Sequence, residues 1–418
     1  MSSNILNILI LHRMGDPKKW RSAVRELELA LPEQRPEHNY VIHDAELPLP
    51  PFIKDIPFHA IIMGPTFLGA RRYPGLYKRI KKEYAFLKMT SAYKIGLPQD
   101  DYDCADNLDS WAVDWRFDEL VTVLPEFKSI IYPKFSKNGR IRSGYTGYVS
   151  NKWIEQWSEL IPHQTRAVDV CYRASRLPPN FGKIGYIKGH IGEFFLKHAG
   201  ESNLVFDIST DPKHMIPGSR WNQFIANSKT CLTTNSGSSI LDRDGSIRLR
   251  VNEYLSLNSR ASFEEVREAC FKGLDEKCNM TALSPRNIEA ALAGTVQIAV
   301  SGEYGGIFKK NEHYFHLEDD ASNAKEVLDS IRDLDRIKKI ANSAKEAVLG
   351  VRELRYDYHL DTILNNIWDH QNDIYKSSDL DKFKRFYPMF EAYREVAGTI
   401  YWNMKRFAKS VVYFSKSS

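Results

Sequence analysis

The stretch L-S-P-R-N-I-E-A-A-L-A-G-T-V-Q-I-A-V-S-G-E-Y-G-G, residues 283–306, decides the fold. Ser284 followed by Pro285 is typical of a helix start, because serine caps free N–H groups and proline fits the first helical position. Gly294 ends this helix, and the apolar-rich run Val296–Val300 predicts a strand. A helix followed directly by a strand indicates an α/β unit.

Short strand-like runs alternate with helical patterns along the rest of the chain. Strands are expected at residues 5–11, 40–43, 59–63, 93–97, 119–124, 168–172, 204–208 and 230–233. Helices are expected at residues 18–30, 76–90, 182–199, 219–227, 263–272, 324–333 and 337–352. Strands separated by helices of about 10–15 residues imply βαβ units and parallel sheets.

The turn-rich segment 133–148 interrupts this alternation, so the chain contains two successive α/β series. We therefore predict two Rossmann-like domains facing a cleft, over residues 1–165 and 166–352. Residues 353–418 are expected to form C-terminal helices that end in a basic amphipathic tail. Because open parallel sheets bind ligands beyond the carboxyl ends of their strands, the cleft is the expected site.

Composition is that of a globular protein. The chain has 418 residues, 43% hydrophobic and 27% charged, which excludes wholesale disorder and fits two domains of ~100–200 residues. No window approaches the ~18–20 continuous apolar residues of a membrane-spanning helix, and the run Ile5–Leu11 indicates a buried strand instead of a signal peptide. Five widely spaced cysteines without a C-x-x-C pair predict a reduced cytoplasmic protein.

The net charge of +5 is concentrated at the C-terminus. Residues 376–418 contain nine basic and four acidic side chains, so the rest of the chain is neutral. A dedicated nucleic-acid binder would carry its basic patch on the domain itself, so this class of function is disfavoured.

The helix start at residue 284 is a candidate anion site. Free N–H groups and the helix dipole at Ser284 favour a bound phosphate, and Arg286 would add a bidentate contact. Glu289, one turn further along, could reach the ribose hydroxyls of a nucleotide. On residue types alone, an ordinary helix cap with a solvated Arg–Glu pair explains the pattern as well.

The same stretch resembles the signature of family-one-like glycosyltransferases of the two-domain GT-B fold, S-x-x-x-x-E-A-x-A-x-G-x-P-V. The segments G-E-Y-G-G-I-F and N-E-H-Y-F-H-L-E-D-D resemble the loop and strand that follow in that family. The resemblance covers mainly residues 165–350. It implies a nucleotide-sugar donor without a cofactor or metal, with Glu289 at the donor ribose and Ser284 and Arg286 at its phosphates.

The chain departs from the family pattern at two places. Thr281 stands where many retaining members have a second Glu, and Val296 stands in place of the usual Pro, with Thr295 between it and Gly294. The S-P-R variant with E-Y-G-G also resembles transferases of bacterial surface-polysaccharide and lipopolysaccharide synthesis. Some of these are similar to the CMP-Kdo-using branch, in which an aspartate can be the catalytic group.

The segment T-T-N-S-G-S-S-I-L-D-R-D-G-S, residues 233–246, follows an expected strand. Main-chain N–H groups at Ser236 and Gly237 could wrap an anion of the donor. Asp242 and Asp244 form a D-x-D pattern, for which a metal site is discounted because the resemblance implies none. Either aspartate could line the cleft as a base or nucleophile, or both could belong to a turn.

Basic residues in segment 172–193 are further candidates for donor binding. Lys183 or Lys188 could stabilise the leaving diphosphate or monophosphate, on which negative charge grows; the alternative is an exposed basic helix. His12, which follows the first strand, is a candidate general base, although a structural role is as plausible. His313-x-x-His316 has no third partner, so a zinc site is not expected.

These patterns predict a glycosyltransferase that moves a sugar from a nucleotide sugar to a glycan or lipid-linked acceptor of surface polysaccharide synthesis. A CMP-Kdo-type transferase with a catalytic Asp is one alternative. An epimerase or phosphorylase of the same fold is another, and a non-catalytic sugar-nucleotide-binding scaffold protein is a third.

The tail is amphipathic. Apolar residues recur at helical spacing over residues 389–414, at Phe390, Tyr393, Ala397, Ile400, Met404, Phe407 and Val411. One interpretation is a helix that lies on the anionic inner leaflet of the cytoplasmic membrane, near lipid-linked acceptors. The other is a helix packed on the body or against another copy.

Overall fold

The structure, a computed structural model, describes residues 5–216, 218–371 and 378–414. The first domain is built on a six-stranded parallel sheet of order β2-β1-β3-β4-β5-β6. Its strands are β1 (Asn7–His12), β2 (Asn39–Asp44), β3 (Ala60–Met63), β4 (Tyr93–Gly96), β5 (Glu119–Thr122) and β6 (Arg140–Ser143). Its helices are α1 (Ser22–Gln34), α2 (Pro65–Leu68), α3 (Pro74–Glu83), α4 (Ala105–Asp114) and α5 (Lys128–Ile131).

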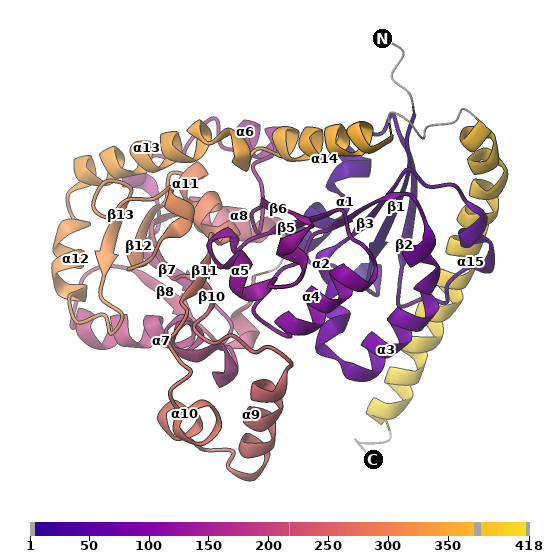
Figure 1. The fold of residues 1–418 in the computed structure, drawn as a ribbon. Helices are drawn as coiled ribbons and strands as arrows, with labels where there is room; N and C mark the ends of the chain where they lie inside the picture. Colours follow the sequence, from indigo (N-terminus) through magenta and orange to yellow (C-terminus); the bar gives the residue numbers. More distant parts are fainter. Residues whose placement is uncertain (1–4, 217, 372–377, 415–418) are drawn as a thin grey trace.

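The second domain is built on a five-stranded parallel sheet of order β13-β12-β9-β7-β8. Its strands are β7 (Val168–Arg173), β8 (Phe206–Ser209), β9 (Ser228–Thr233), β12 (Val296–Val300) and β13 (Tyr314–Leu317). Its helices are α7 (Gly182–Ala199), α8 (Ser219–Ala226), α11 (Pro285–Leu292), α12 (Ala324–Ser330) and α13 (Leu334–Gly350). The predicted fold class, two Rossmann-like α/β domains with C-terminal helices, is confirmed (Figure 1).

Both faces of each sheet are covered, which explains the nearly continuous apolar strands. All six residues of β1 are buried. On one face of the first sheet lie α3 and α4, with Trp111 and Trp115 in the core. On the other lie α1 and α14 (Tyr356–Gln371), the latter through Ile363 and Ile367. The chain therefore returns to the first domain after completing the second, and Figure 1 shows α13 and α14 running in succession along both.

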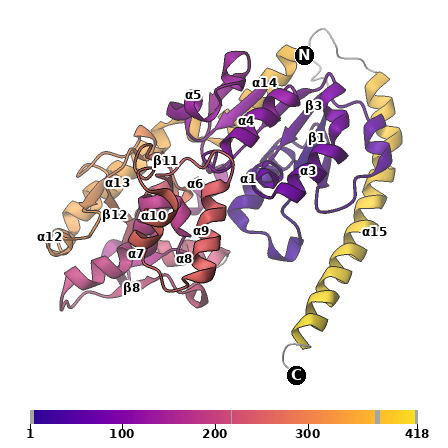
Figure 2. The same cartoon turned by 60° about the horizontal axis from the view of Figure 1, so that its bottom comes forward.

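Helix α15 (Ser378–Phe414) also packs on the first domain. Phe383 and Phe390 belong to the core of this domain. Figure 2 shows the helix running along the domain and extending past it. No helix in residues 5–216, 218–371 and 378–414 has both the length and the hydropathy needed to cross a bilayer.

The domains are joined by the segment that contains α6 (Asn151–Gln156) and by α14, and also by a non-covalent clamp. In this clamp, the residues before α9 (Ser246–Leu257) pair with the loop after β4. Cys104 N donates to Asp242 O at 2.7 Å, and Asp242 N donates to Tyr102 O at 3.0 Å. Arg248 forms a 3.0 Å ion pair with Asp103. The domains are thus held together beside the cleft as well as through the chain.

Three local expectations need correction. The turn-rich segment 133–148 contains β6, an edge strand whose sequence R-I-R-S is too polar to be recognised. The helix expected at 76–90 ends at Glu83 and continues as a 3-10 turn over Ala85–Met89. The segment between β9 and β12 holds a small antiparallel pair, β10 (Ser236–Ser238) with β11 (Met280–Ala282), and the helices α9 and α10 (Phe263–Phe271). Figure 1 shows α9 and α10 projecting from the second domain.

Candidate functional site

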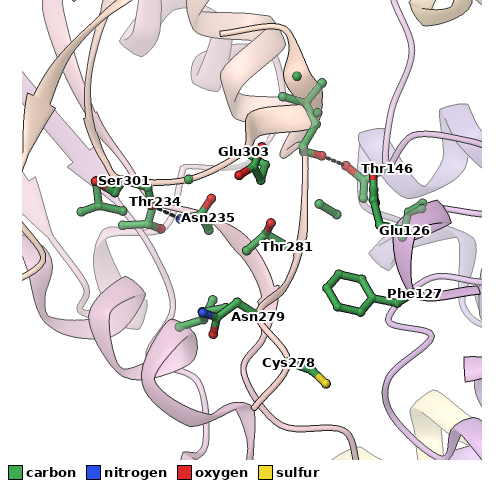
Figure 3. Close-up of a pocket in the computed structure, with 18 of the residues that line it drawn as sticks. Glu126, Phe127, Thr146, Thr234, Asn235, Cys278, Asn279, Thr281, Ser301 and Glu303 are labelled. Atoms are coloured by element: carbon green, nitrogen blue, oxygen red, sulfur yellow. Dashed lines mark hydrogen bonds between the residues drawn. The ribbon is translucent and has the colours of Figure 1, made fainter. Parts of the chain in front are cut away.

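A pocket of about 850 Å³ lies between the two domains. The first domain contributes the segments that follow β5 and β6, with Glu126, Phe127 and Thr146 on the pocket wall. The second contributes the ends of β9 and β12, with Asn235 and Ser301 (Figure 3). The carboxyl ends of strands from both sheets therefore meet at this pocket, which is where open parallel sheets bind ligands.

Asn235 presents an unused acceptor to this pocket. Its Nδ2 donates to Ser301 O at 2.7 Å, which fixes the amide. Its Oδ1 is buried without a hydrogen-bond partner in the described part of the chain, and the side chain is only 9% exposed. A side chain at Gly302 would collide with this amide. A buried carbonyl oxygen without a donor is costly, so this atom suits a hydroxyl or N–H of a ligand.

The loop after β12 forms one wall of the pocket. Tyr304, Gly305 and Gly306 all have positive φ angles, of 43°, 65° and 70°, so the chain turns back sharply here. The buried Tyr304 anchors the loop by donating from its hydroxyl to Val300 O at 2.7 Å. The G-E-Y-G-G motif thus forms a fixed wall, with Glu303 exposed to the pocket.

The start of α11 lies beside the pocket, as the sequence predicts for a helix beginning at Ser284. The Ser284 side chain accepts from Arg286 N at 3.3 Å, and Asn287 accepts from Ser284 N at 3.0 Å, which completes a capping box. Thr146 from the first domain donates to Leu283 O at 2.5 Å (Figure 3). Leu283 lines the pocket, so the helix N-terminus is positioned at its edge.

Arg286 and Glu289 do not form a solvated pair on an exposed face. Both contact Trp221 of α8: the Arg286 guanidinium lies 5.2 Å from an indole ring centre, and the indole Nε1 donates to Glu289 at 2.7 Å. Arg286 also donates to the main-chain oxygen of Arg173 at the end of β7, and its Nε is buried without a partner in the described residues. Burial raises the pKa of Glu289, which is only 9% exposed.

Lys188 joins this group electrostatically. Burial, and then the charge of Arg286, lowers its pKa to about 8, while Asp100 of the first domain opposes the shift. Within the described residues its ammonium group has no hydrogen-bond or ion-pair partner. Two cations held close together with little counter-charge form a natural binding site for a phosphate group.

Lys183 lies at the rim of the interdomain pocket. Its ammonium group is 3.0 Å from Glu276 and 3.8 Å from Asp319. The hydrogen bond that Lys183 donates to Glu276 raises the pKa of the lysine, so the side chain is charged and already paired.

Glu289 lines a second cavity of about 1080 Å³ between α1, α6, α8 and α11. Glu26 of the first domain lines the same cavity. Burial, and then the charge of Glu289, raises the pKa of Glu26 to about 7. Helix α11 therefore separates two cavities, with Leu283 at one and Glu289 at the other.

Several expected site residues lie elsewhere. Ser236 and Gly237 are not an anion-binding loop, because they form the antiparallel β10–β11 ladder, in which Gly237 packs directly against the main chain of Met280. The turn interpretation of Asp242 and Asp244 is the one that the geometry supports. The Asp242 carboxylate accepts from the N–H groups of Gly245, Ile247 and Arg248 at 2.9–3.3 Å, which caps α9. Asp244 accepts from Ser246 N at 3.0 Å. Neither aspartate lines the interdomain pocket.

His12 is in a third cavity, against α15, and it is not a suitable general base. Burial lowers its pKa to about 4, so the ring is neutral near pH 7. Its Nδ1 accepts from Met14 N at 3.3 Å, which places the remaining proton on Nε2. Among the described residues, no three His, Cys, Asp or Glu side chains are grouped so that they could hold a metal ion.

The residues that sequence reasoning missed are Trp221, Asn235 and Glu26. A tryptophan in a short amphipathic helix is indistinguishable from a core residue, and Glu26 is one of several acidic residues on α1. Asn235 lies in the candidate segment T-T-N-S-G-S-S, but the sequence predicts anion contacts only for Ser236 and Gly237, which follow it.

No family model matches the sequence, and no curated protein sequence matches it. Several solved structures are similar to this one. S. aureus TarM is 13% identical with a TM-score of 0.44, over 76% of this chain and 56% of that one. T4 phage β-glucosyltransferase with UDP-glucose is 10% identical, with a TM-score of 0.44 over 87% and 99%. Anabaena HepE with UDP-glucose is 13% identical, with a TM-score of 0.41 over 87% and 100%. The chain spans little more than half the length of TarM.

Proposed function

We propose that this chain is a nucleotide-sugar-dependent glycosyltransferase of GT-B architecture. The observation that carries the proposal is the Trp221-centred group of Arg286 and Glu289, in which Trp221 and Glu289 line the second interdomain cavity. The two cations, Arg286 and Lys188, suit the phosphates of a nucleotide. The buried carboxylate beside them suits the ribose hydroxyls, and the indole suits the base. The sequence resemblance of residues 283–306 also assigns Arg286 and Glu289 to the donor.

In this proposal, α11 and its neighbours bind the donor and the first domain presents the acceptor. Arg286 and Lys188 contact the donor phosphates, and the Glu289 carboxylate accepts from a ribose hydroxyl. The bond between the anomeric carbon and the leaving phosphate oxygen breaks as the acceptor hydroxyl forms its bond to that carbon. Lys188 and Arg286 stabilise the negative charge that grows on the leaving phosphate in the transition state.

The acceptor hydroxyl must lose its proton to a base. Asp242, Asp244 and His12 lie outside the interdomain pocket, so they are not proposed for this role. Glu126 of the first domain and Glu303 of the second both line the pocket and have no ion-pair partner in the described residues. We propose these two carboxylates as the candidates, one from each domain.

Donor turnover tests the proposal. Incubation with UDP-, GDP-, ADP- and CMP-sugars should give slow hydrolysis of one donor. If no donor is bound or turned over, the proposal that the chain is a nucleotide-sugar-dependent glycosyltransferase is refuted. Binding without turnover would instead favour the scaffold alternative, and conversion to an isomeric nucleotide sugar would favour the epimerase. The CMP-Kdo-type alternative depended on Asp242 or Asp244 as the catalytic group, and neither lines the interdomain pocket. Turnover of a CMP-sugar would support this alternative.

The proposed acceptor is a glycan or a lipid-linked glycan of a bacterial surface polysaccharide. The support is the similarity of the S-P-R and E-Y-G-G segments to transferases of that type. The structure of α15 is compatible with work at a membrane surface, because the stripe of apolar residues predicted from the sequence divides into two faces. Phe390 is 1% exposed and packs on the body, whereas Phe407 is 72% exposed.

We further propose that the outer face of α15 rests on the cytoplasmic leaflet. Its large apolar side chains are exposed: Met389, Val396, Ile400, Met404 and Phe407. Lys405 and Arg406 are engaged with Glu46 and Asp16 of the body at 3.2 and 3.1 Å. Binding should therefore depend more on apolar insertion than on the attraction of the basic residues to anionic lipid. The side chain of Val411 lies outside the described residues.

Co-sedimentation with vesicles tests this contact. The double variant Met404→Glu, Phe407→Glu should lose binding to phosphatidylglycerol-containing vesicles. The matched control Leu249→Glu, Leu257→Glu changes two exposed leucines of α9 and should bind as the wild type does. Truncation of the whole helix is a poorer test, because Phe383 and Phe390 belong to the core. Equal binding by both double variants would remove the membrane contact.

A further inference from the structure

A cavity of about 480 Å³, named here the α15 cavity, lies between the carboxyl ends of β1 and β2 and the inner face of α15. It shares no lining residue with either interdomain cavity. Its volume falls in the range of about 300–1,000 Å³ that is common for small-molecule sites. It also occupies the edge of a parallel sheet at which such folds bind ligands.

Four aromatic side chains line the α15 cavity: Trp20, Phe390, Tyr393 and Trp402. The polar atoms of two of them are already used, because Trp20 Nε1 donates to Gly15 O at 2.8 Å and Tyr393 OH donates to Pro48 O at 2.7 Å. These bonds fix the positions of the rings while leaving their faces for apolar contact. Tryptophan and tyrosine faces suit a ligand that is apolar on one side and polar at its edge.

The remaining wall combines apolar residues such as Leu29 and Ile42, exposed charged residues such as Lys18 and Arg394, and two deeply buried polar residues. His12 is 3% exposed, and with Nδ1 accepting from Met14 N its Nε2–H is a donor that has no partner among the described residues. Asp44 is 8% exposed and lines the same cavity, with one carboxylate oxygen accepting from Glu46 N at 2.9 Å. The N–H groups of Glu46 and Gly15 already donate to the Asp44 carboxylate. An alkyl chain placed against this wall would leave His12 Nε2–H without an acceptor and would give the buried Asp44 carboxylate no further donor, which is unfavourable.

We propose that the α15 cavity binds a neutral sugar ring. The ring stacks its C–H face on the aromatic side chains, accepts a hydrogen bond from His12 Nε2–H, and donates a hydroxyl to the Asp44 carboxylate. The assignment of this sugar to the acceptor glycan rests on the proposed function; the binding site itself does not. A growing glycan would then contact the first domain at the α15 cavity as well as at the interdomain pocket.

Saturation-transfer NMR on the full chain tests the site without a nucleotide donor. The probes are the methyl glycosides of glucose, galactose, mannose and N-acetylglucosamine, together with octyl β-glucoside. At least one methyl glycoside should receive saturation at its ring protons. Asp44→Asn should weaken this binding about tenfold, the value expected for loss of a hydrogen bond to a charged group. Trp20→Ala removes an aromatic face on which the sugar stacks, so it should also weaken binding. Asp55→Asn, an exposed carboxylate outside the cavity, is the matched control.

The possible outcomes separate the two proposals. Silence of all four methyl glycosides, or saturation confined to the octyl chain of octyl β-glucoside, would overturn the sugar site in favour of an empty or lipid-binding cavity. Sugar binding that both cavity variants retain would overturn it as well, provided that their circular dichroism and thermal midpoints match the wild type. Donor hydrolysis measured in parallel reports on the proposed transferase independently, since it requires no acceptor sugar.

Discussion

Trp221 donates a 2.7 Å hydrogen bond from its indole nitrogen to the buried carboxylate of Glu289. This bond joins α8 to α11, and the same indole supports the guanidinium of Arg286. The tryptophan therefore holds an anion and a cation of the proposed donor site in fixed positions. Preorganised groups of this kind bind a ligand without losing further conformational freedom.

Glu289→Ala should weaken donor binding by about tenfold or more, because a ribose hydroxyl loses its charged acceptor. Trp221→Phe keeps the ring but removes the N–H, so it should have a smaller effect on the same dissociation constant. Isothermal titration with the nucleotide that the donor panel identifies measures both. Glu268→Ala, an exposed change on α10, is the control. An unchanged dissociation constant in Glu289→Ala would remove Glu289 from the site.

Lys188→Gln should reduce donor turnover by roughly 10²-fold, as expected when a group that stabilises transition-state charge is removed. Because the pKa of Lys188 is lowered to about 8, its charge is lost as the pH rises through 8, and turnover should fall over the same interval. In Lys188→Arg this decline should move to higher pH. Lys197→Gln, at the end of the same helix, should keep the wild-type profile. A pH profile that is identical in wild type and Lys188→Arg would contradict the assignment.

Asp242→Asn should retain both fold and donor turnover, since asparagine caps helices as well as aspartate does. Asp242→Ala should lower the free energy of unfolding by about 1 kcal/mol, because three N–H groups at the start of α9 lose their acceptor. Urea denaturation and the hydrolysis assay measure the two effects. Loss of turnover in a folded Asp242→Asn protein would show that this carboxylate has a chemical role after all.

Glu26 makes stability depend on pH. Its pKa in the folded protein is about 7, above the ordinary value of 4.5, so between these values the folded state holds the proton more tightly than the unfolded state. Stability should therefore fall as the pH rises from about 4.5 to 7. Glu26→Gln should remove this part of the decline and unfold at a higher temperature than wild type at pH 8, while the two should be similar at pH 4.5. Differential scanning calorimetry at the two pH values measures the effect, and a variant less stable at pH 8 would contradict it.

The elements that the sequence predicted well are those whose signals are local. Helix α7 and strand β12 have the predicted limits, and α11 begins at Pro285, directly after the Ser284 cap that the sequence predicts. A cap, a glycine stop and an apolar run are all contained in a few consecutive residues. The alternation of strands and helices was sufficient to establish the fold class for the same reason.

The site was less predictable because its contacts join distant residues. Trp221 and Glu289 are 68 positions apart, and no pattern in either helix indicates that they meet. The sequence left the roles of Asp242 and His12 open for a related reason. Aspartate and histidine are both common catalytic residues. The burial of His12 and the N–H groups that donate to Asp242 are properties of the folded chain, and the sequence alone does not show them. The sequence of the charged tail likewise does not show that Lys405 and Arg406 form ion pairs with Glu46 and Asp16 of the first domain.

The clamp formed by Asp103 and Arg248 has a mechanical consequence. Two rigid bodies joined only along one side can swing apart, whereas an additional attachment on another side removes that degree of freedom. Substrates would then enter by threading along a passage of fixed width, and the rate of exchange would be set by diffusion through it instead of by the opening of the domains. Because Asp103 is buried, salt screens this ion pair only weakly. Asp103→Asn, which removes the charge of the pair, should accelerate nucleotide release.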